Sequence, residues 1–119
     1  MKNAPFFFVI TSVYVMKVTP SKLDGCVNVT FLNDPNVDVP RCNVPNVDYE
    51  TLVDFVEALS DVVVGNIQGK DAEEYTIRQN QDNLVVKFYG FEFLVPKDDF
   101  QITEKFCYDF FEMYGEPMM

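Results

Sequence analysis

The chain contains no histidine, and this absence limits the chemistry that its side chains can perform. Histidine has an unperturbed pKa near neutrality and commonly activates a serine or cysteine nucleophile. Without it, Ser-His and Cys-His nucleophilic systems and all imidazole metal sites are excluded. Carboxylate pairs, lysine and tyrosine can also transfer protons, but they form no recognisable catalytic set in this sequence. We therefore expect a protein that is not an enzyme, with no catalytic residue, metal site or cofactor.

Two segments resemble ligand-binding motifs but depart from them at the residues that would hold the ligand. Residues 65–71 read Gly-Asn-Ile-Gln-Gly-Lys-Asp, similar to a phosphate-binding loop. The two glycines are one residue too close, and Asp71 replaces the hydroxyl side chain that would bind magnesium. Residues 34–45 begin like a calcium loop, but Val39 and Pro45 stand where the turn glycine and the glutamate are required. Neither a nucleotide site nor an EF-hand is expected.

The acidic residues are concentrated in the later part of the chain. The sequence has 19 acidic and 9 basic residues, for a net charge of −10. Residues 1–33 carry a net +2, whereas residues 34–119 carry a net −12. Long-range repulsion therefore disfavours direct binding to nucleic acid or to an anionic membrane, and it favours a protein partner with a basic surface. The alternative is that the acids only keep the protein soluble.

A row of carboxylates is expected on the first predicted helix. Asp48 is suited to cap a helix over residues 49–61, and apolar residues recur there at the i, i+3, i+4, i+7 spacing of a core-facing stripe. At about 100° per residue, the opposite side presents a row about 16 Å long, formed by Glu50, Asp54, Glu57 and Asp61. Like charges at i, i+4 cost a few tenths of a kcal/mol per pair, which suggests a compensating partner. The alternative is an ordinary solvated helix face.

The most specific interpretation of this row is a small acidic inhibitor that blocks a nucleic-acid-handling protein by presenting a carboxylate face. A duplex carries one charge per about 1.7 Å of its axis, so four carboxylates over about 16 Å are too sparse to imitate it alone. Further acids would have to lie on the same side, and the second predicted helix carries several. Such inhibitors are commonly made by phages, and by that analogy the protein would act in the cytoplasm of a host cell.

The second predicted helix is dense in large apolar side chains. Over residues 102–114 they cover about half of the helix circumference, which exceeds a typical core stripe. One interpretation is a helix clamped between a sheet and a loop. In the other, Tyr108 or Phe111 belongs to an exposed aromatic patch that anchors a partner or a second copy of the chain. Such a patch suggests two alternative functions, an immunity-type or adaptor protein and a self-assembling structural subunit.

The predicted elements follow the order β-β-α-β-β-β-α, which indicates an α+β fold with a mainly antiparallel sheet of about five strands and two helices. They cover residues 6–18, 26–32, 49–61, 62–64, 75–77, 84–95 and 98–114. Residues 80–83 form a plausible hairpin connection. Residues 84–95 form either a tight hairpin about Gly90 or one long strand with a bulge. No linker separates these elements, so we expect a single acidic domain over residues 1–119.

Three further features bear on folding and location. Residues 33–47 contain three prolines, so we expect a long ordered loop or a flexible flap, which could itself bind the partner.

The apolar stretch 6–16 resembles a short signal peptide, but it has no cleavage site and is too short to span a bilayer. We therefore expect it to form a buried strand. Three widely spaced cysteines, in no C-x-x-C motif, indicate reduced thiols in a cytoplasmic protein, and the alternative is a single disulfide.

Overall fold

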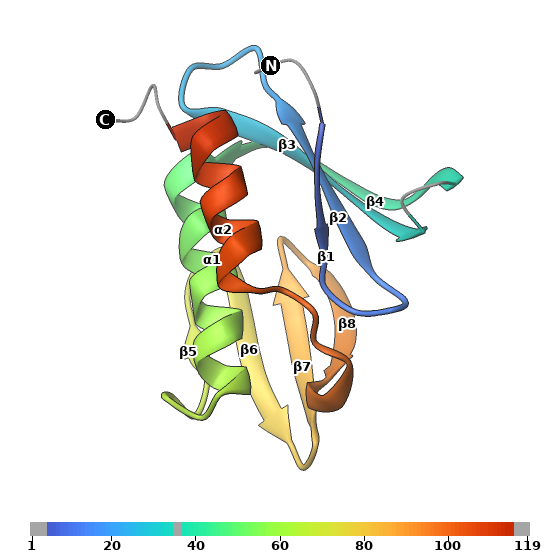
Figure 1. The fold of residues 1–119 in the computed structure, drawn as a ribbon, viewed down its shortest axis with the longest axis vertical. Helices are drawn as coiled ribbons and strands as arrows, with labels where there is room; N and C mark the ends of the chain where they lie inside the picture. The colour runs from blue at the N-terminus through green and yellow to red at the C-terminus, as the bar shows by residue number, and fades with distance from the viewer. Residues whose placement is uncertain (1–4, 35–36, 116–119) are drawn as a thin grey trace. The chain divides into compact units, whose positions relative to one another are not determined.

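The computed structural model describes residues 5–34 and 37–115, which form two compact units. The first unit contains Met1–Tyr49 and Gln101–Met119, and the second contains Glu50–Phe100. Each unit has a four-stranded antiparallel sheet whose strands follow one another in chain order (Figure 1). The α+β class is thereby confirmed, but two sheets replace the single sheet of about five strands that the sequence predicts. The expectation of one domain stays a prediction.

The first unit is a β-meander with the last helix packed on it. Its elements are β1 (Phe6–Val9), β2 (Val15–Pro20), β3 (Cys26–Asp34), β4 (Val37–Asp48), α2 (Glu104–Phe110) and a π-helical turn, η2 (Phe111–Gly115). The buried ring of Phe110 lies with its centroid 5.4 Å from that of Phe6 and 5.1 Å from that of Phe8. Tyr49 stacks on the same ring at 5.4 Å. These aromatic contacts fix α2 on one face of the sheet.

A tight turn divides the apolar run that the sequence predicts as one strand over residues 6–18. The turn covers residues 10–14, between β1 and β2. The Thr11 hydroxyl accepts hydrogen bonds from the backbone N–H groups of Val13 and Tyr14, both at 3.1 Å. Threonine side chains stabilise turns in this way, so the break is built from a polar residue inside an apolar run. After this turn, β2 pairs antiparallel with β3.

The segment predicted as a loop or flap over residues 33–47 is instead largely strand. Most of it belongs to β4, and residues 35–36 lie outside the described part of the chain. β4 is the edge strand of its sheet. Proline has no N–H group to donate to a neighbouring strand. An edge strand tolerates it because its outer side pairs with no other strand. Pro40 and Pro45 therefore exclude a central strand, as expected, but not an edge strand.

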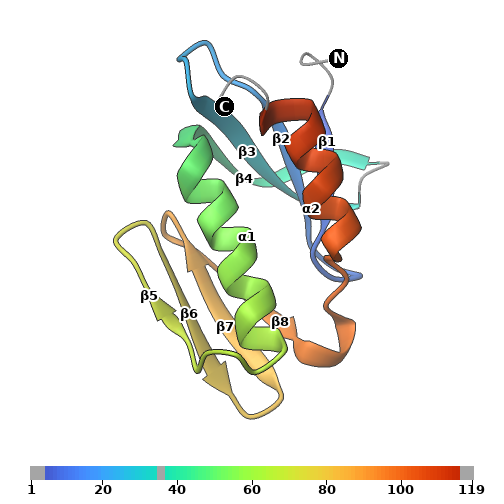
Figure 2. The same cartoon turned by 60° about the vertical axis from the view of Figure 1, so that its left-hand side comes forward.

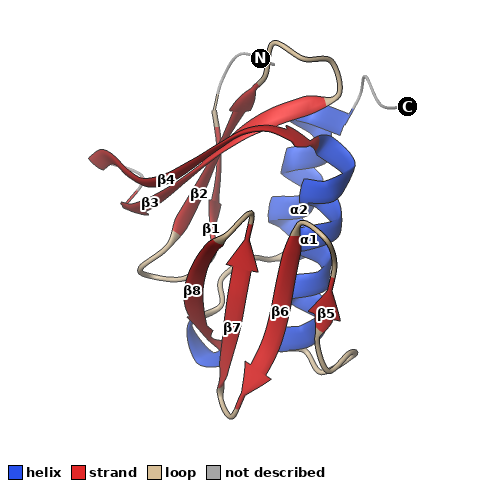
Figure 3. Ribbon diagram, turned by 180° about the vertical axis from the view of Figure 1, so that it is seen from behind, coloured by secondary structure: helices blue, strands red, loops and turns tan. Residues whose placement is uncertain are grey.

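Bulges bend the long ribbon that β3 and β4 form (Figure 3). The register shifts at three places, each time with one more residue on β4 than on β3. One of the shifts includes Asn46, whose φ of 55° lies in the left-handed region that asparagine tolerates. The Asn46 N–H donates to Asn28 Oδ1 at 3.0 Å, and Asn46 Oδ1 accepts a hydrogen bond from Ser21 Oγ at 2.5 Å. These contacts hold the edge strand in place despite its prolines.

The second unit packs one helix on a second β-meander (Figure 2). Its elements are α1 (Tyr49–Val63), β5 (Lys70–Asp71), β6 (Tyr75–Asn80), β7 (Asn83–Phe88), β8 (Phe91–Pro96) and a 3-10 turn, η1 (Lys97–Asp99). The ring of Phe55 is fully buried, with its centroid 4.5 Å from that of Phe88 and 5.1 Å from that of Tyr75. The helix predicted over residues 49–61 and its core-facing stripe are therefore confirmed. Lys70 begins β5.

Two tight hairpins connect strands of the second sheet. Residues 81–82 join β6 to β7 inside the polar connection predicted at residues 80–83. Tyr89 and Gly90 join β7 to β8 and have φ values of 48° and 86°. Positive φ at both central residues is typical of a type I′ turn, whose twist suits a two-residue hairpin. Of the two alternatives for residues 84–95, the hairpin is therefore confirmed.

α1 continues through residues that the sequence predicts as a strand. Val62 is completely buried on the helix, so the strand predicted over residues 62–64 is wrong. A Schellman motif then ends the helix: the Gly65 N–H donates to the Val62 carbonyl at 3.2 Å, and the Asn66 N–H donates to the Asp61 carbonyl at 2.8 Å. The low helix propensity of valine costs about half a kcal/mol per residue, which burial of one such side chain outweighs.

Replacing Gly65 by alanine should lower the free energy of unfolding by about 1 kcal/mol. Its φ of 86° strains any residue with a Cβ atom, although no other atom lies within 4 Å of the position that the Cβ would take. Urea unfolding followed by circular dichroism measures the loss. Gly65→Asn is the control, because asparagine tolerates the left-handed conformation and should cost less. Equal losses in the two variants would contradict this backbone explanation.

The last helix begins later than the sequence predicts. Residues 98–99, predicted as its first residues, lie in η1 instead. Phe100 then has an extended backbone, with φ −69° and ψ 126°, and the Gln101 N–H donates to the Ile10 carbonyl at 2.9 Å. This backbone bond ties the chain to the end of β1 before α2 can start. The helix therefore begins at Glu104.

Candidate functional site

The four acidic residues predicted to line one side of α1 differ in exposure. Glu50, Asp54 and Glu57 are exposed, whereas Asp61 is half-buried. The apolar side chains of α1, such as Leu52, Phe55 and Leu59, are buried. The carboxylates therefore lie on the side of the helix away from this buried stripe. We refer to these four residues as the acidic face. Because the backbone of a single helix positions them, the row predicted from the sequence forms on one rigid element.

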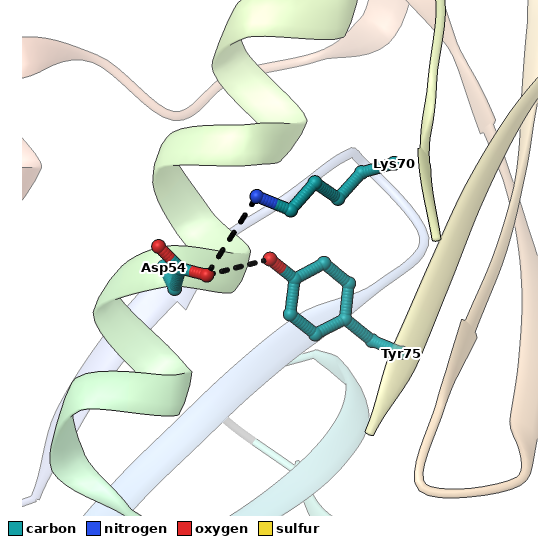
Figure 4. A network of polar contacts seen from close by, with 3 residues as sticks. All are labelled: Asp54, Lys70 and Tyr75. Carbon is teal, nitrogen blue, oxygen red and sulfur yellow. Dashed lines mark hydrogen bonds and ion pairs between the residues drawn. The ribbon is translucent and has the colours of Figure 1, made fainter. Parts of the chain in front are cut away.

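Two residues of the second sheet hold Asp54 (Figure 4). Asp54 Oδ2 accepts a hydrogen bond from Tyr75 Oη at 3.1 Å and lies 3.9 Å from Lys70 Nζ. The side chains of Asp54 and Lys70 are 59% and 41% exposed, so solvent screens this ion pair and it adds little stability. The Tyr75 hydroxyl orients the carboxylate, while more than half of the Asp54 side chain remains available to a partner.

Carboxylates from two segments surround the Tyr75 hydroxyl. Burial of the Tyr75 side chain raises its pKa, and the charge and hydrogen bond of Asp54 raise it further. The charges of Glu74, in the β5–β6 connection, and of Glu57 act in the same direction. The phenol therefore remains protonated at neutral pH and serves as a donor to Asp54.

Raising the pH above about 10 should destabilise the protein, and Tyr75→Phe should reduce this effect. Burial raises the pKa of Tyr75 and of Tyr49 in the folded chain. A group with a raised pKa in the folded state adds stability that is complete below its unfolded pKa, about 10 for tyrosine, and is lost as the pH rises further. Urea unfolding of the wild type and Tyr75→Phe at pH 8, 10 and 11 tests this. Parallel losses in both proteins would contradict it.

The other members of the acidic face have different surroundings. Asp61 Oδ1 accepts a hydrogen bond from Asn66 Nδ2 at 3.2 Å, next to the cap that ends α1. Asp61 therefore contributes to the helix terminus as well as to the charge of the face. Glu50 and Glu57 make no hydrogen bond or ion pair within the described residues. Two carboxylates are thus free of such contacts there, one is oriented by Tyr75, and one supports the fold.

The sequence alone does not identify Lys70, Tyr75 or Glu74 as neighbours of α1. Glu73 and Glu74 are visible as an acidic pair, but only the pairing of β5 with β6 brings their connection beside the helix. The negative charge also divides unevenly between the two units. The second unit contains 11 of the acidic and 4 of the basic residues, for a net charge of −7. Most of the negative charge therefore belongs to the unit that carries the acidic face.

The two aromatic residues predicted to anchor a partner lie at the end of α2 and the start of η2. Tyr108 is 68% exposed and Phe111 is 38% exposed. Residues three apart on a helix lie on the same side, so the two rings form a small exposed aromatic patch. Lys105 and Asp109 form an ion pair at 3.0 Å beside it. This exposure favours the aromatic-patch interpretation over a helix that is covered on both sides; its role in binding stays a prediction.

Other chemical features are few in the part of the chain that the structure describes. No cluster of three or more histidine, cysteine or carboxylate residues is placed there to hold a metal ion, and the three cysteines are free thiols. None of the helices described is long and apolar enough to cross a bilayer. Comparisons with protein-family models, with curated protein sequences and with solved structures found no match for this chain.

Proposed function

We propose that this protein inhibits a nucleic-acid-handling protein by placing the acidic face of α1 in the partner's basic groove. The observation that carries the proposal is the exposure of Glu50, Asp54 and Glu57 along one side of a single helix. A preformed row of charges loses little conformational entropy on binding, because the helix already fixes its spacing. The partner would therefore be a protein with a basic surface, and nucleic acid would compete for the same surface.

The spacing of the carboxylates suits a single strand better than a duplex. The acidic face is about 16 Å long, a length over which one strand of a duplex carries about five phosphates and both strands carry about nine. Four carboxylates approach the first value and fall well below the second. The net charge of −7 in the second unit adds a longer-range field that speeds association with a basic surface. The acidic face would thus replace the phosphates of one strand in the groove.

Salt-dependent capture followed by competition tests this function. The tagged protein would be used to capture partners from a host lysate at low and high salt, with identification by mass spectrometry. We expect one basic, nucleic-acid-binding protein that is lost at high salt and is displaced by a single-stranded oligonucleotide. Retention of the partner in the presence of saturating oligonucleotide would show that the two sites differ, and it would overturn the proposed inhibition.

A second candidate function rests on the exposure of Tyr108, which is unusual for an aromatic residue of a helix packed on a sheet. In this case the protein is an immunity-type or adaptor protein that grips one partner through Tyr108 and Phe111, or a subunit that assembles with copies of itself. The acidic residues of the protein would then lie only at the rim of this interface. The exposed aromatic side chains would supply most of the binding free energy, as they do at the centre of many interfaces.

Under this second function, Tyr108→Ala should weaken partner binding by at least about 2 kcal/mol, whereas added salt should change it little. Calorimetric titration of the captured partner measures both effects. Asp109→Asn is a matched control on the adjacent residue, because it alters charge at the rim without removing a ring. Unchanged affinity in Tyr108→Ala and Phe111→Ala would exclude the aromatic anchor, and a monomer by light scattering would exclude self-assembly.

A further inference from the structure

Each sheet has two edge strands, and three of these four edges carry features that hinder pairing with another chain. Proline, charge, bulges and short length are the usual means of protecting an edge. β4 contains Pro40 and Pro45 and is bulged, whereas β5 has only two residues. β8 contains the exposed Glu92 and ends at Pro96. β1 has none of these features, because its sequence is Phe-Phe-Phe-Val and its register is continuous.

The backbone of β1 has unpaired groups on its outer side. The Ile10 N–H donates to the Tyr14 carbonyl at 3.0 Å, in line with the register of β1 and β2. Hydrogen-bonded pairs alternate with unbonded pairs in an antiparallel ladder, so the even-numbered residues of β1 bond to β2. The N–H and C=O groups of Phe7 and Val9 therefore point away from β2. They form no hydrogen bond with any residue that the structure describes.

The side chains of the same two residues are also incompletely covered. Phe7 and Val9 are half-buried, whereas Phe6 and Phe8 are buried against the ring of Phe110. Phe110 belongs to α2, which lies beside β1 in Figures 1 and 2. Aromatic and β-branched side chains form favourable cross-strand pairs. The edge thus offers both unpaired backbone groups and apolar side chains to another strand.

We infer that β1 pairs with β1 of a second copy of this chain, antiparallel about a two-fold axis at Phe8. In this register Phe7 lies opposite Val9 of the second copy, and Val9 lies opposite its Phe7. All four outward N–H and C=O groups of each copy then find hydrogen-bond partners. The edge is complementary to itself, as a two-fold interface requires. The partner is therefore a second copy of the chain.

The neighbouring symmetric registers are less favourable. With Phe7 opposite itself, Val9 would face Pro5, which has no N–H group to donate. With Val9 opposite itself, Phe7 would face Thr11, whose N–H already donates to the Tyr14 carbonyl at 3.2 Å. The register about Phe8 is the one that uses every outward group.

The size of the contact indicates a weak dimer. Two four-residue strands alone bury less than the about 1,200 Å² of a typical stable interface. The two-fold axis is perpendicular to the joined sheet, so both α2 helices lie on the same face, one on each side of the axis. Tyr108 and Phe111 are exposed on this helix and on the turn that follows it. Their rings enlarge the apolar contact beside the paired strands.

The dimer does not depend on the proposed inhibitory function. β1 and α2 belong to the first unit, whereas Glu50, Asp54, Glu57 and Asp61 of the acidic face belong to the second. The dimer instead gives self-assembly a defined surface and a defined partner. Either the dimer or the inhibition can fail while the other holds.

Hydrogen exchange followed by nuclear magnetic resonance tests the pairing without any substitution. The full chain is compared at about 20 µM and about 1 mM, which bracket the dissociation constant of a weak interface. The amides of Phe7 and Val9 should exchange rapidly in the dilute sample. Their exchange should slow about fivefold in the concentrated sample, as mass action gives for a dissociation constant of about 0.1 mM. The amide of Phe8 bonds to β2 and should be protected in both samples.

Sedimentation velocity over the same concentrations should show a monomer that converts to a dimer. A monomer throughout would overturn the inference. Rapid exchange of both Phe7 and Val9 in both samples would also overturn it, because the edge would then stay unpaired. Protection of both amides in both samples would overturn it as well, because another segment of the same chain would then cover the edge.

Two substitutions at one residue separate pairing from folding. Val9→Pro removes an outward N–H and leaves the bonds to β2 intact, as proline does on an edge strand. Two hydrogen bonds per dimer are lost, so the dissociation constant should rise at least about fivefold. Val9→Lys places a protecting charge on the edge and should also prevent dimerisation.

Leu23→Lys is the matched control. Leu23 is 55% exposed in the connection between β2 and β3, so the change removes an apolar side chain and adds the same charge away from β1. This variant should dimerise like the wild type. Circular dichroism identifies the folded variants. Wild-type dimerisation of a folded Val9→Lys or Val9→Pro protein, or equal loss of the dimer in Leu23→Lys, would overturn the assignment to β1.

Discussion

Replacing Glu50, Asp54 and Glu57 together by lysine should abolish binding to the proposed basic partner. The three substitutions change the charge of one helix face by six units and turn attraction into repulsion. A close charge pair across an interface contributes about 1.5 kcal/mol or more, so the loss of three pairs weakens binding at least about a thousandfold. Isothermal titration calorimetry of the purified partner at physiological salt measures the effect. Wild-type affinity in the triple variant would exclude the acidic face as the binding site.

The triple variant should still fold, because the substitutions avoid the buried side of α1. Leu52, Phe55 and Leu59 are completely buried and unchanged. Loss of the hydrogen bond from Tyr75 to Asp54 costs about 1 kcal/mol, and lysine near the helix N-terminus costs a few tenths more. The far-ultraviolet circular dichroism spectrum should therefore match that of the wild type. A loss of binding in a protein with this spectrum is attributable to the surface charge.

A matched control separates the acidic face from net charge alone. Asp82, Glu92 and Asp98 are exposed and lie outside α1, and replacing all three by lysine also changes the charge by six units. Charges beyond about 8–10 Å are largely screened at physiological salt, so this variant should bind within about threefold of the wild type. An equal loss in both triple variants would mean that overall charge, and not the row on α1, governs binding.

The sequence predicts α1 and its two faces well because both depend on local periodicity. The buried residues recur at i, i+3, i+4 and i+7, and the acids take the remaining positions. The end of the helix is less predictable from local pattern. Valine favours strands weakly, whereas the burial of Val62 and the cap at Gly65 depend on tertiary structure and on one backbone conformation. Predicting the end of α1 therefore requires the glycine to be given more weight than the valines that precede it.

The two sheets are harder to predict because the position of a strand in its sheet decides which residues that strand tolerates. Pro40 and Pro45 are compatible with β4 only because that strand lies at an edge, and edge position is not a property of the local sequence. The break at Thr11 is a local feature by contrast, because its hydroxyl accepts hydrogen bonds from the N–H groups of residues two and three positions further along the chain. The apolar run over residues 6–18 therefore forms two strands, β1 and β2, although its composition is uniform.

The candidate site shows the same division between local and long-range information. The four acids of α1 follow from helical spacing alone, whereas the contacts of Asp54 reach Lys70 and Tyr75, which are 16 and 21 residues further along the chain. Nothing in the local sequence pairs these residues. The turn at Tyr89 is predictable only in part, because Gly90 between two apolar runs is compatible with a hairpin or with a bulged strand. What composition does not reveal is that the tyrosine takes a left-handed conformation.

Truncating Phe110 to alanine should be among the single substitutions that lower stability most. Its side chain is 2% exposed and its ring contacts those of Phe6, Phe8 and Tyr49. Removal of a buried phenylalanine costs about 3–5 kcal/mol, because the lost burial is joined by a cavity that neighbouring groups fill only partly. That is a large fraction of the roughly 5–15 kcal/mol that stabilises a typical domain. Urea unfolding followed by tyrosine fluorescence measures the change.

Phe111→Ala is the control, because it removes the adjacent and more exposed ring and so separates the effect of burial from the loss of an aromatic side chain. Phe111 is the next residue along the chain and is 38% exposed, and its ring lies 6.4 Å from that of Phe110. Since a partly exposed ring loses less burial on truncation and leaves no closed cavity, its removal should cost about 1–2 kcal/mol, clearly less than that of Phe110. A large difference between neighbours would place the stabilising contact of α2 on Phe110 and leave Phe111 available to a partner. Similar losses in both variants would mean that α2 is covered on both sides, and the aromatic-anchor function would then lose its physical basis.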